Sequence, residues 1–383
     1  MQLSNFPRRR LTGVSLVIVS LVGLAAAVAA PAASASAKAA TAPGAAASAY
    51  SSRWHVRTIL RESAAKQIVA QAVNPRTGVD YVLVPRLATP TGPVGPYQLQ
   101  RTDLATGVGR KGPKFTVTGL TLAAGYLWVS GFTPARRDES RLLVYQVNPT
   151  TLAVIRSRHL LRKSLLNPII TVTAGPGHTA WVGFLGTMLR VDTRTGARVG
   201  AITLSRGALD GGAAVDPARR YLYVSGYGGR AYGGDVFEYS AGSGRLLARN
   251  SHHLLQGACD GCAALTAVPG GVWGSVRGGT EGHTLLFRQR GLRNVPLSGS
   301  IFGWQTAPSA TTVYGGHALW LASDSGGIAC IVPNTGIIRR QTTLAQLEYH
   351  GGVLFAVDAH SHLIYGLGGT GLIAITPPRG CWN

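Results

Sequence analysis

Acidic residues, lysine and methionine are all scarce in this chain of 383 residues. There are 15 Asp and Glu residues against 37 Lys and Arg residues, only five of the basic residues are lysine, and there are two methionines. Charged residues make up 14% of the chain and hydrophobic residues 45%, which excludes the weakly hydrophobic, highly charged class of disordered proteins. The shortage of long helix-forming side chains, together with 51 Gly and 20 Pro, predicts many turns and short strands.

Long uncharged apolar runs are also rare, and the single one lies near the N-terminus. Arg8, Arg9 and Arg10 precede residues 11–30, which carry no charge. The small residues that follow, at 33–35 and 35–37, fit the pattern that a signal peptidase cleaves. We therefore expect residues 1–37 to be a signal peptide and the mature chain to begin at Lys38, or at Ser36 if the earlier site is used. An uncleaved membrane anchor is the alternative, since twenty apolar residues can span a bilayer.

The segment after this predicted signal peptide contains little except small residues. Residues 38–51 are rich in Ala and Ser, which predicts a flexible tether, and the folded domain is expected over residues 52–383. No second apolar run predicts a membrane anchor after cleavage. The expected location is outside the cytoplasmic membrane, secreted or associated with the cell envelope.

The net charge of +22 has two interpretations. The positive field could attract a carbohydrate or another anionic polymer, or it could be a general surface bias that keeps an exported protein soluble. The basic residues are spread along the chain, and aromatic residues do not alternate with a basic cluster as they do in a single-strand-binding groove. No specific nucleic-acid partner is therefore predicted.

An apolar, aromatic strand recurs along the chain. It is recognised at DYVLV, YLWVSG, TAWVGF, YLYVSG, GVWGSV, ALWLAS and VLFAV, whose aromatic residues are Tyr81, Trp128, Trp181, Tyr223, Trp273, Trp320 and Phe355. Successive spacings are 47, 53, 42, 50, 47 and 35 residues. A period in the forties with several short strands is typical of β-propeller blades.

A hairpin recurs after this strand. Sequences such as VDTRTGARVGAI and VPNTGIIRRQ place a polar turn ending in Gly between two strands, where Gly supplies the positive φ that the turn needs. Adding a short inner strand gives a four-stranded blade. We predict an all-β fold, a single β-propeller of about seven blades, with six or eight as alternatives and a β-sandwich as the competing fold.

The repeat resembles those of the bacterial YVTN and NHL-like propellers. The resemblance rests on YLYVSG and on the turn of the D-x-x-T-G kind, and it implies architecture rather than activity. Quinone-dependent dehydrogenases have a similar turn, but their docking Trp is replaced here by Val and Ile. No motif links the chain to the propeller lyases that cleave streptogramins.

Closure of the ring and the cysteines give two further expectations. The last repeat shows three candidate strands, AQLEYHG, GVLFAVDAH and LIYGLGGTGLIAIT, and the alternating sequence near residues 53–60 is predicted to supply the fourth. Four cysteines in an exported chain predict disulfides, with Cys259–Cys262 and Cys330–Cys381 favoured among three possible pairings. A zinc site at Cys259 and Cys262 with two nearby histidines, or a redox Cys-x-x-Cys, are the alternatives.

The loops between the middle strands of each blade are expected to form the functional face. They were identified as residues 132–140, 225–235, 277–283, 323–327 and 358–362. The candidate ligand-binding residues on them are Arg137, Tyr227, Arg230, Arg277, Glu281, His283, Asp324, Asp358, His360 and His362. The pairs Glu281 with His283 and Asp358 with His360 are the candidates for metal binding or acid–base chemistry, if they converge at the ring axis.

The sequence supports two hypotheses about function. The first is a binding or protein-interaction scaffold outside the membrane, because no catalytic motif stands out and no cofactor is predicted. The alternative is a metal-assisted lyase or hydrolase with its site at the central channel. Neither hypothesis identifies a substrate or a catalytic residue.

Overall fold

The computed structural model describes a β-propeller within residues 53–382. The described residues are 53–61, 68–89, 92–134, 140–161, 170–184, 186–204, 212–227, 234–250, 263–277, 284–290, 293–295, 310–323, 326–347, 354–368 and 371–382. All of them belong to one compact unit, Ser36–Asn383, and the N-terminal unit Met1–Ala35 lies outside them. No helix in these ranges is long and apolar enough to cross a membrane.

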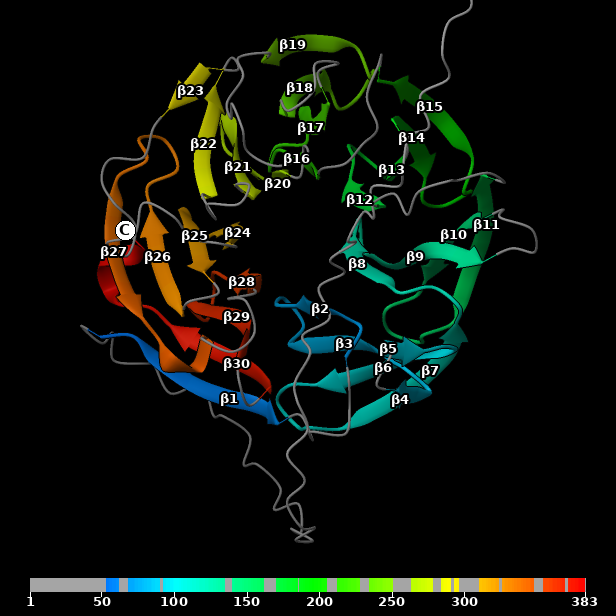
Figure 1. Ribbon diagram of the computed structural model, residues 1–383, viewed down its shortest axis with the longest axis horizontal. Coiled ribbons are helices and arrows are strands. Elements are labelled where there is room, and N and C mark those ends of the chain that lie inside the picture. The colour runs from blue at the N-terminus through cyan, green and yellow to red at the C-terminus, as the bar shows by residue number, and fades with distance from the viewer. Residues whose placement is uncertain are drawn as a thin grey trace, which may run out of the picture. The chain divides into compact units, whose positions relative to one another are not determined.

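Seven four-stranded antiparallel sheets make up the described structure, as the repeat predicted (Figure 1). Blade 1 contains β2 (Ala70–Asn74), β3 (Val79–Val84), β6 (Tyr97–Asp103) and β7 (Gly109–Phe115), with a small ribbon of β4 (Leu87–Thr89) and β5 (Gly92–Val94) between β3 and β6. Blade 2 contains β8 (Gly119–Ala123), β9 (Tyr126–Pro134), β10 (Ser140–Val147) and β11 (Val154–Leu161). Blade 3 contains β12 (Thr171–Ala174), β13 (Thr179–Phe184), β14 (Thr187–Asp192) and β15 (Arg198–Thr203).

The remaining blades repeat this order. Blade 4 contains β16 (Ala213–Val215), β17 (Tyr221–Tyr227), β18 (Gly234–Ser240) and β19 (Leu246–Asn250). Blade 5 contains β20 (Ala263–Val268), β21 (Gly271–Arg277), β22 (Thr284–Arg290) and β23 (Arg293–Val295). Blade 6 contains β24 (Ala310–Gly315), β25 (Ala318–Ser323), β26 (Gly327–Ile331) and β27 (Ile338–Thr343). Blade 7 contains β28 (Leu354–Asp358), β29 (Leu363–Gly368), β30 (Gly371–Thr376) and β1 (His55–Arg61).

The first strands of the blades line the inside of a closed ring. Neighbouring first strands contact one another in the order β2, β8, β12, β16, β20, β24 and β28, and β28 contacts β2 again. Apolar side chains are buried between the faces of neighbouring blades, among them the fully buried Trp181, Trp273 and Trp320. The hydrophobic core is therefore a series of inter-blade layers rather than one central cluster.

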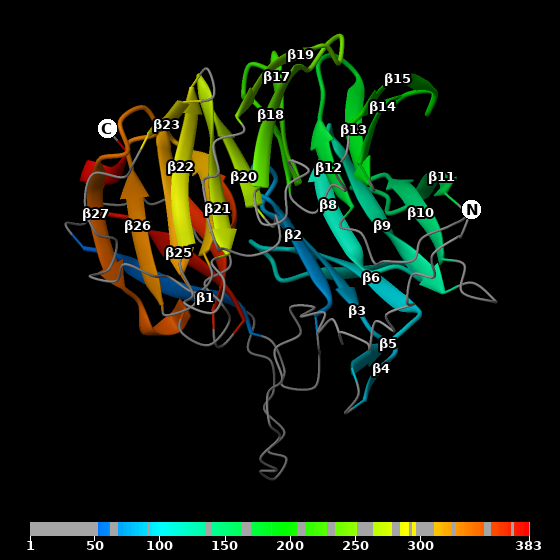
Figure 2. The same cartoon turned by 45° about the horizontal axis from the view of Figure 1, so that its top comes forward.

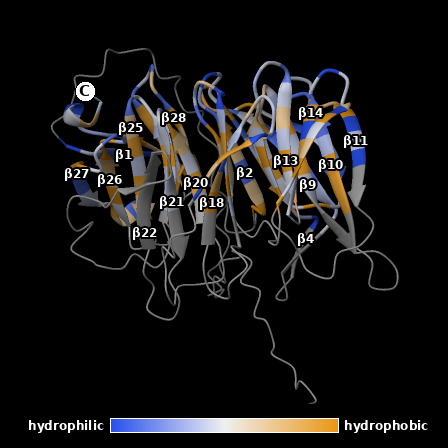
Figure 3. Cartoon of the chain, turned by 90° about the horizontal axis from the view of Figure 1, so that it is seen from above, coloured by the Kyte–Doolittle hydropathy of each residue, from blue (hydrophilic) through white to orange (hydrophobic). Residues whose placement is uncertain are grey.

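Two faces of the ring follow from the antiparallel order of each blade (Figure 2, Figure 3). The turns that join the first strand to the second, and the third to the fourth, lie at one end of the strands. We call this end the turn face. The connections from the second strand to the third, and from one blade to the next, lie at the other end, which we call the connection face.

Hydrogen bonds from one blade to a turn of the next recur around the ring. Tyr81 Oη donates to the carbonyl of Pro149 at 3.1 Å, Trp181 Nε1 to that of Ala241 at 3.1 Å, and Trp273 Nε1 to that of Pro333 at 3.2 Å. In each case a second-strand aromatic residue contacts the turn between the third and fourth strands of the following blade. Three of the aromatic residues that revealed the repeat therefore join neighbouring blades, whereas Trp128 and Trp320 donate to carbonyls of Ala123 and Gly315 in their own blades.

The ring closes where the two ends of the chain meet. The N-terminal strand β1 pairs antiparallel with β30, with His55 opposite Thr376, and so completes blade 7 as predicted (Figure 1). Cys330 on β26 forms a disulfide with Cys381, which follows β30 in the short 3₁₀ helix η2 (Arg379–Cys381). Trp382 packs against Trp320 with ring centroids 4.9 Å apart.

The sequence analysis misaligned the last repeat. AQLEYHG was expected to be a strand, but Ala345–Leu347 forms a 3₁₀ helix, η1, and residues 348–350 lie outside the described part. LIYGLGGTGLIAIT supplies two strands, β29 and β30, rather than one. The strand with Phe355 is therefore the first of its blade, and Tyr365 on β29 takes the place that Trp320 has in blade 6.

Candidate binding surface

In several turns between third and fourth strands, the side chain of the first turn residue accepts hydrogen bonds from backbone N–H groups of the same turn. Asp103 Oδ1 accepts hydrogen bonds from the backbone N–H groups of Ala105 at 3.0 Å and Thr106 at 2.9 Å. Asp192 Oδ1 accepts the equivalent bonds from Arg194 at 2.9 Å and Thr195 at 2.7 Å. These backbone hydrogen bonds, led by those from Thr106 and Thr195, lower the pKa of both carboxyls. Both acids are thereby committed to turn structure.

The outer, fourth strands of the blades carry basic residues and no acidic ones. β1, β7, β11, β15, β19, β23 and β27 contain twelve Lys or Arg residues and no Asp or Glu. We call these twelve residues the basic girdle: Arg57, Arg61, Arg110, Lys111, Lys114, Arg156, Arg158, Arg198, Arg249, Arg293, Arg339 and Arg340. Figure 3 shows hydrophilic residues along β11 and β27. One sign of charge is thus concentrated on the outside of the ring.

Most acidic residues fall elsewhere in the blade repeat. Eight of the fifteen occur in segments that connect second to third strands or one blade to the next: Glu62, Asp138, Glu139, Asp210, Asp260, Glu281, Asp324 and Glu348. These eight lie outside the described residues. Two others, Asp80 and Asp216, are buried. The connecting segments carry charges of both signs, whereas the outer strands carry basic residues alone, a difference that the overall value of +22 does not reveal.

Girdle residues differ in how firmly the fold holds them. Arg156 Nη1 donates to Gln146 Oε1 and to the carbonyl of Thr193 in the next blade, both at 3.2 Å. Arg249 lies over the Phe237 ring, 5.4 Å from its centroid. Arg249 is nevertheless exposed, as are Arg158, Arg198 and Arg340. The exposed members are the ones available to a partner, and the anchored members keep the strands in place.

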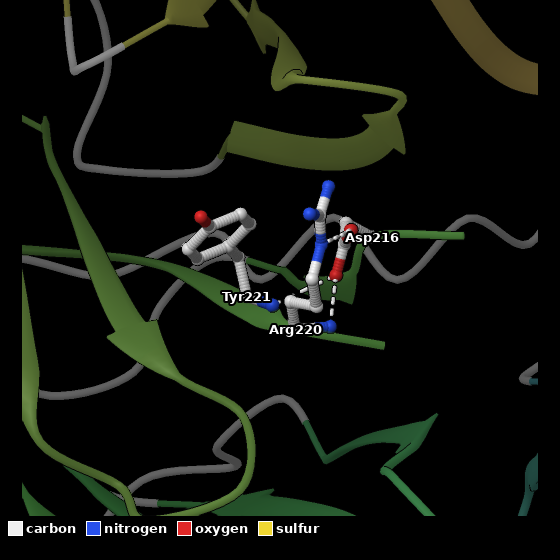
Figure 4. Close-up of polar contacts among 3 residues, drawn as sticks. All are labelled: Asp216, Arg220 and Tyr221. Atoms are coloured by element: carbon white, nitrogen blue, oxygen red, sulfur yellow. Dashed lines mark hydrogen bonds and ion pairs between the residues drawn. The ribbon is translucent and has the colours of Figure 1, made fainter. Parts of the chain in front are cut away.

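The buried Asp216 and the partly buried Glu238 of blade 4 belong to a second polar feature, which was not predicted from the sequence. The Asp216 carboxylate accepts a hydrogen bond from the backbone N–H of Tyr221 at 2.7 Å and lies 3.9 Å from Arg220 Nε (Figure 4). Burial raises the pKa of Tyr223 strongly, and the nearby Glu238 and Asp216 raise it further. Burial likewise raises the pKa of the Glu238 carboxyl. The hydrogen bonds that the Asp216 carboxylate accepts come from backbone N–H groups at the end of the turn between β16 and β17, so this carboxylate stabilises blade 4.

Several predicted ligand-binding residues lie beyond what the structure describes. Arg137, Arg230, Glu281, His283 and Asp324 are outside the described residues, as are Cys259 and Cys262. Tyr227 and Arg277 end β17 and β21 at the connection face, but their side chains are not described. Their role in ligand binding remains a prediction.

The placement of Asp358, His360 and His362 was wrong. This segment joins β28 to β29, the first and second strands of blade 7, and so lies on the turn face. Asp358 Oδ1 accepts the backbone N–H of His360 at 3.0 Å, and His362 packs edge-on against Trp382 with centroids 4.9 Å apart. Residues 278–283, which hold Glu281 and His283, fall between β21 and β22 in the sequence and outside the described residues, so the predicted convergence of the two pairs stays untested.

Metal coordination finds no support in the described ranges, where no group of three or more His, Cys, Asp or Glu residues is placed to hold an ion. A shallow recess lies between blades 2 and 3, lined by Trp128, Val144, Gln146, Arg156, Arg158, Val182, Val191 and Gly196. The recess lies at the junction where Gln146 and Arg156 of blade 2 bond to blade 3, and two of its lining residues, Arg156 and Arg158, belong to the basic girdle.

Comparison with known proteins supports the architecture. The chain matches no protein-family model and no curated protein sequence. Among solved structures, the computationally designed Ika8 protein aligns with a TM-score of 0.50 and 14% identity, over 83% of this chain and 98% of that one. BamB from Moraxella catarrhalis aligns with a TM-score of 0.49 and 15% identity, over 80% of this chain and 83% of that one. Identities this low speak to fold alone, and the β-propeller is shown by the seven four-stranded sheets of the structure itself.

Proposed function

We propose that the protein is an exported binding scaffold that holds an anionic partner on its basic girdle, outside the cytoplasmic membrane. The observation that carries the proposal is the composition of the outer strands, with twelve basic residues and no acidic one. Such a surface attracts polyanions through many weak contacts that release counterions. The rigid ring keeps those contacts in a fixed arrangement.

Export is supported by two independent features. The N-terminal sequence has the basic, apolar and small-residue regions of a signal peptide. The disulfide between Cys330 and Cys381 is of a kind that persists in oxidising compartments outside the cytoplasm. N-terminal sequencing of the exported protein should give Lys38 or Ser36 as the first residue. Recovery of the intact chain from Met1 in membranes alone would favour an uncleaved anchor.

The test of the binding proposal compares two sets of four arginines. The girdle-side set is Arg158, Arg198, Arg245 and Arg340, one from each of blades 2, 3, 4 and 6, all of them exposed. The loop set is Arg136, Arg137, Arg230 and Arg277, from the second-to-third connections where the candidate ligand face was predicted. Changing each set to Gln removes the same charge, so net charge is equal in the two variants.

Retention on soluble polyphosphate and on an anionic polysaccharide is then measured across a salt series. We expect the girdle-side set to weaken retention at least tenfold more than the loop set and to reduce its salt dependence. A greater loss from the loop set would instead favour a ligand at the connection face, with Tyr227, Glu281 and His283 as its proposed contacts. Equal losses would mean a diffuse field without a site and would contradict the proposal.

A further inference from the structure

Exposed aliphatic side chains occupy one repeated place in the fold. All seven large hydrophobic side chains that are exposed in the described part of the chain lie in an outer strand or directly before one: Val108, Val154, Ile155, Val199, Leu246, Leu247 and Ile337. Their exposed fractions run from 37% for Leu247 to 66% for Val108. Scattered exposed aliphatic residues need no explanation, but this recurrence at equivalent positions of five blades does.

These positions lie at the rim of the turn face. Each third-to-fourth turn ends with a residue of positive φ, namely Gly107, Leu152, Gly196, Gly244 and Gly336. The exposed aliphatic residues follow it by one to three positions, so they lie within roughly 10 Å of the turn along the strand. Six of the seven belong to blades 1 to 4, which are consecutive in the ring. A flat partner could therefore contact several of them at once.

Arginines accompany the aliphatic residues in each of these blades. Arg158 follows Val154 and Ile155 closely on β11, Arg198 precedes Val199 on β15, and Arg245 precedes Leu246 and Leu247. All three arginines are exposed. A soluble polyanion would require the charges alone. Aliphatic side chains interleaved with guanidinium groups are instead suited to the boundary between lipid headgroups and acyl chains, where the aliphatic groups enter and the charges stay with phosphate.

We propose that the turn-face rim of blades 1 to 4 docks peripherally on a bilayer that contains anionic phospholipids. This inference rests on the proposed function, because it names the anionic partner of the same outer strands. Docking would place Val154, Ile155, Leu246 and Leu247 at the acyl boundary and the neighbouring arginines at phosphate groups. It needs no spanning segment and is compatible with cleavage of the N-terminal signal.

The experiment uses the protein recovered after export and vesicles of two compositions, phosphatidylcholine alone and equal parts of phosphatidylcholine and phosphatidylglycerol. An aliphatic variant changes Val154, Ile155, Leu246 and Leu247 to Ser. A matched control, V154I/I155V/L246I/L247I, keeps the apolar surface at the same positions. The arginine variant changes Arg158, Arg198, Arg245 and Arg340 to Gln. Co-sedimentation with vesicles and retention on polyphosphate are measured for each, after thermal melting has verified folding.

The aliphatic variant should lose at least about tenfold in affinity for the phosphatidylglycerol vesicles while its polyphosphate retention stays within about twofold. The control should bind both like the parent, and the arginine variant should lose both. Unchanged vesicle binding by the aliphatic variant, or no vesicle binding by the parent protein, would overturn the lipid inference and leave a soluble polymer as the partner. An arginine variant that binds both probes like the parent would overturn the proposed function itself.

Discussion

The junction between blades 6 and 7 differs from three other junctions of the ring. Between blades 1 and 2, 3 and 4, and 5 and 6, a second-strand aromatic residue donates a hydrogen bond to the next third-to-fourth turn. Blade 7 has no such turn, because its third strand, β30, leads to the C-terminus and its fourth strand, β1, comes from the N-terminus. Trp320, in the same second-strand position, donates to the carbonyl of Gly315 in its own blade at 3.0 Å, and its ring packs against Trp54 and Trp382.

The third strand of blade 6 also differs from those of blades 2 and 4, at the position opposite the second-strand aromatic residue. The residue opposite the second-strand aromatic residue is Gln146 in blade 2, Glu238 in blade 4 and Cys330 in blade 6. Gln146 Nε2 donates to the carbonyl of Thr193 in the next blade at 2.7 Å. Cys330, with no turn to bond, is covalently joined to Cys381. Where chain continuity is missing, a covalent bond therefore takes the place of an inter-blade hydrogen bond.

Among changes at the junction of blades 6 and 7, removal of the closing strand β1 should lower the stability of the fold most. Deleting residues 52–60 leaves β30 without its outer partner and exposes apolar surface that Trp54, Val56 and Leu60 partly cover. Loss of these three side chains alone should cost roughly 5 kcal/mol or more. Thermal melting should show a sharply lower Tm or no cooperative transition.

A deletion of equal length provides the control for that experiment. Residues 40–48 lie in the segment predicted to be a flexible tether, so their loss should leave the Tm unchanged. A strand deletion that melts like the parent protein would mean that the ring does not depend on closure by β1.

Loss of the Cys330–Cys381 disulfide should give the next largest decrease in the free energy of unfolding. The double substitution C330A/C381A frees a loop closed across a sequence separation of 51 residues, which should cost at most about 4 kcal/mol through the entropy of the unfolded chain. The measurement is the free energy of unfolding in denaturant, with and without a thiol reductant.

A second cysteine variant separates this bond from the other cysteine pair. C259A/C262A should still lose stability when reductant is added, whereas C330A/C381A should not respond. If reductant destabilises C330A/C381A as much as the parent protein, the Cys330–Cys381 disulfide does not contribute to stability. That result would contradict the view that it takes the place of the Gln146 hydrogen bond.

Sequence reasoning recovered the repeat because the second strands carry large aromatic residues in apolar strands with a period near 45 residues. It misaligned blade 7 because β28 and β29 are both short, apolar and aromatic, and composition does not distinguish a first strand from a second. The spacing from the preceding aromatic residue does distinguish the two strands. From Trp320, Phe355 is 35 residues away and Tyr365 is 45, and only the latter matches the other blades.

The girdle was missed for a different reason. Arginines recur after each turn, but along the chain they are separated by a whole blade, so no run of charge is visible. Only the ring brings the outer strands to one surface. Four cysteines in an exported chain predicted disulfides, with Cys330–Cys381 favoured among three possible pairings, whereas the equivalence of Cys330 to Gln146 depends on strand register, which sequence alone did not define.

A smaller effect is expected at an ordinary junction. Gln146→Ala removes a buried donor to Thr193 and an acceptor for Arg156, while Arg156 keeps its own bond to the Thr193 carbonyl. The cost should be about 1–2 kcal/mol, since two hydrogen bonds are lost but the Thr193 carbonyl and Arg156 each keep a partner. Gln346→Ala, at an exposed position, is the control and should stay within about 0.5 kcal/mol of the parent. Equal effects of the two substitutions in denaturant unfolding would contradict a docking role for Gln146.

The smallest effect, and one of opposite sign, is expected at Glu238. Burial raises the pKa of this carboxyl above that of an unfolded chain, a hydrogen bond from Tyr223 lowers it in part, and the charge of Asp216 raises it again. The folded state therefore favours the protonated acid. Stability associated with this group is fully present below the unfolded pKa of about 4.3 and is lost as pH rises through the higher folded pKa.

Glu238→Gln supplies a neutral side chain of the same shape, as blade 2 has at Gln146. It should stabilise the protein at pH 7 by less than about 1 kcal/mol, because the carboxylate is only partly buried and water screens it. The gain should shrink toward zero near pH 4, where the parent carboxyl is itself protonated. Thermal melts of the two proteins at matched pH values test this, and a gain that is the same at pH 4 and pH 7 would show that charge at this junction is not its cause.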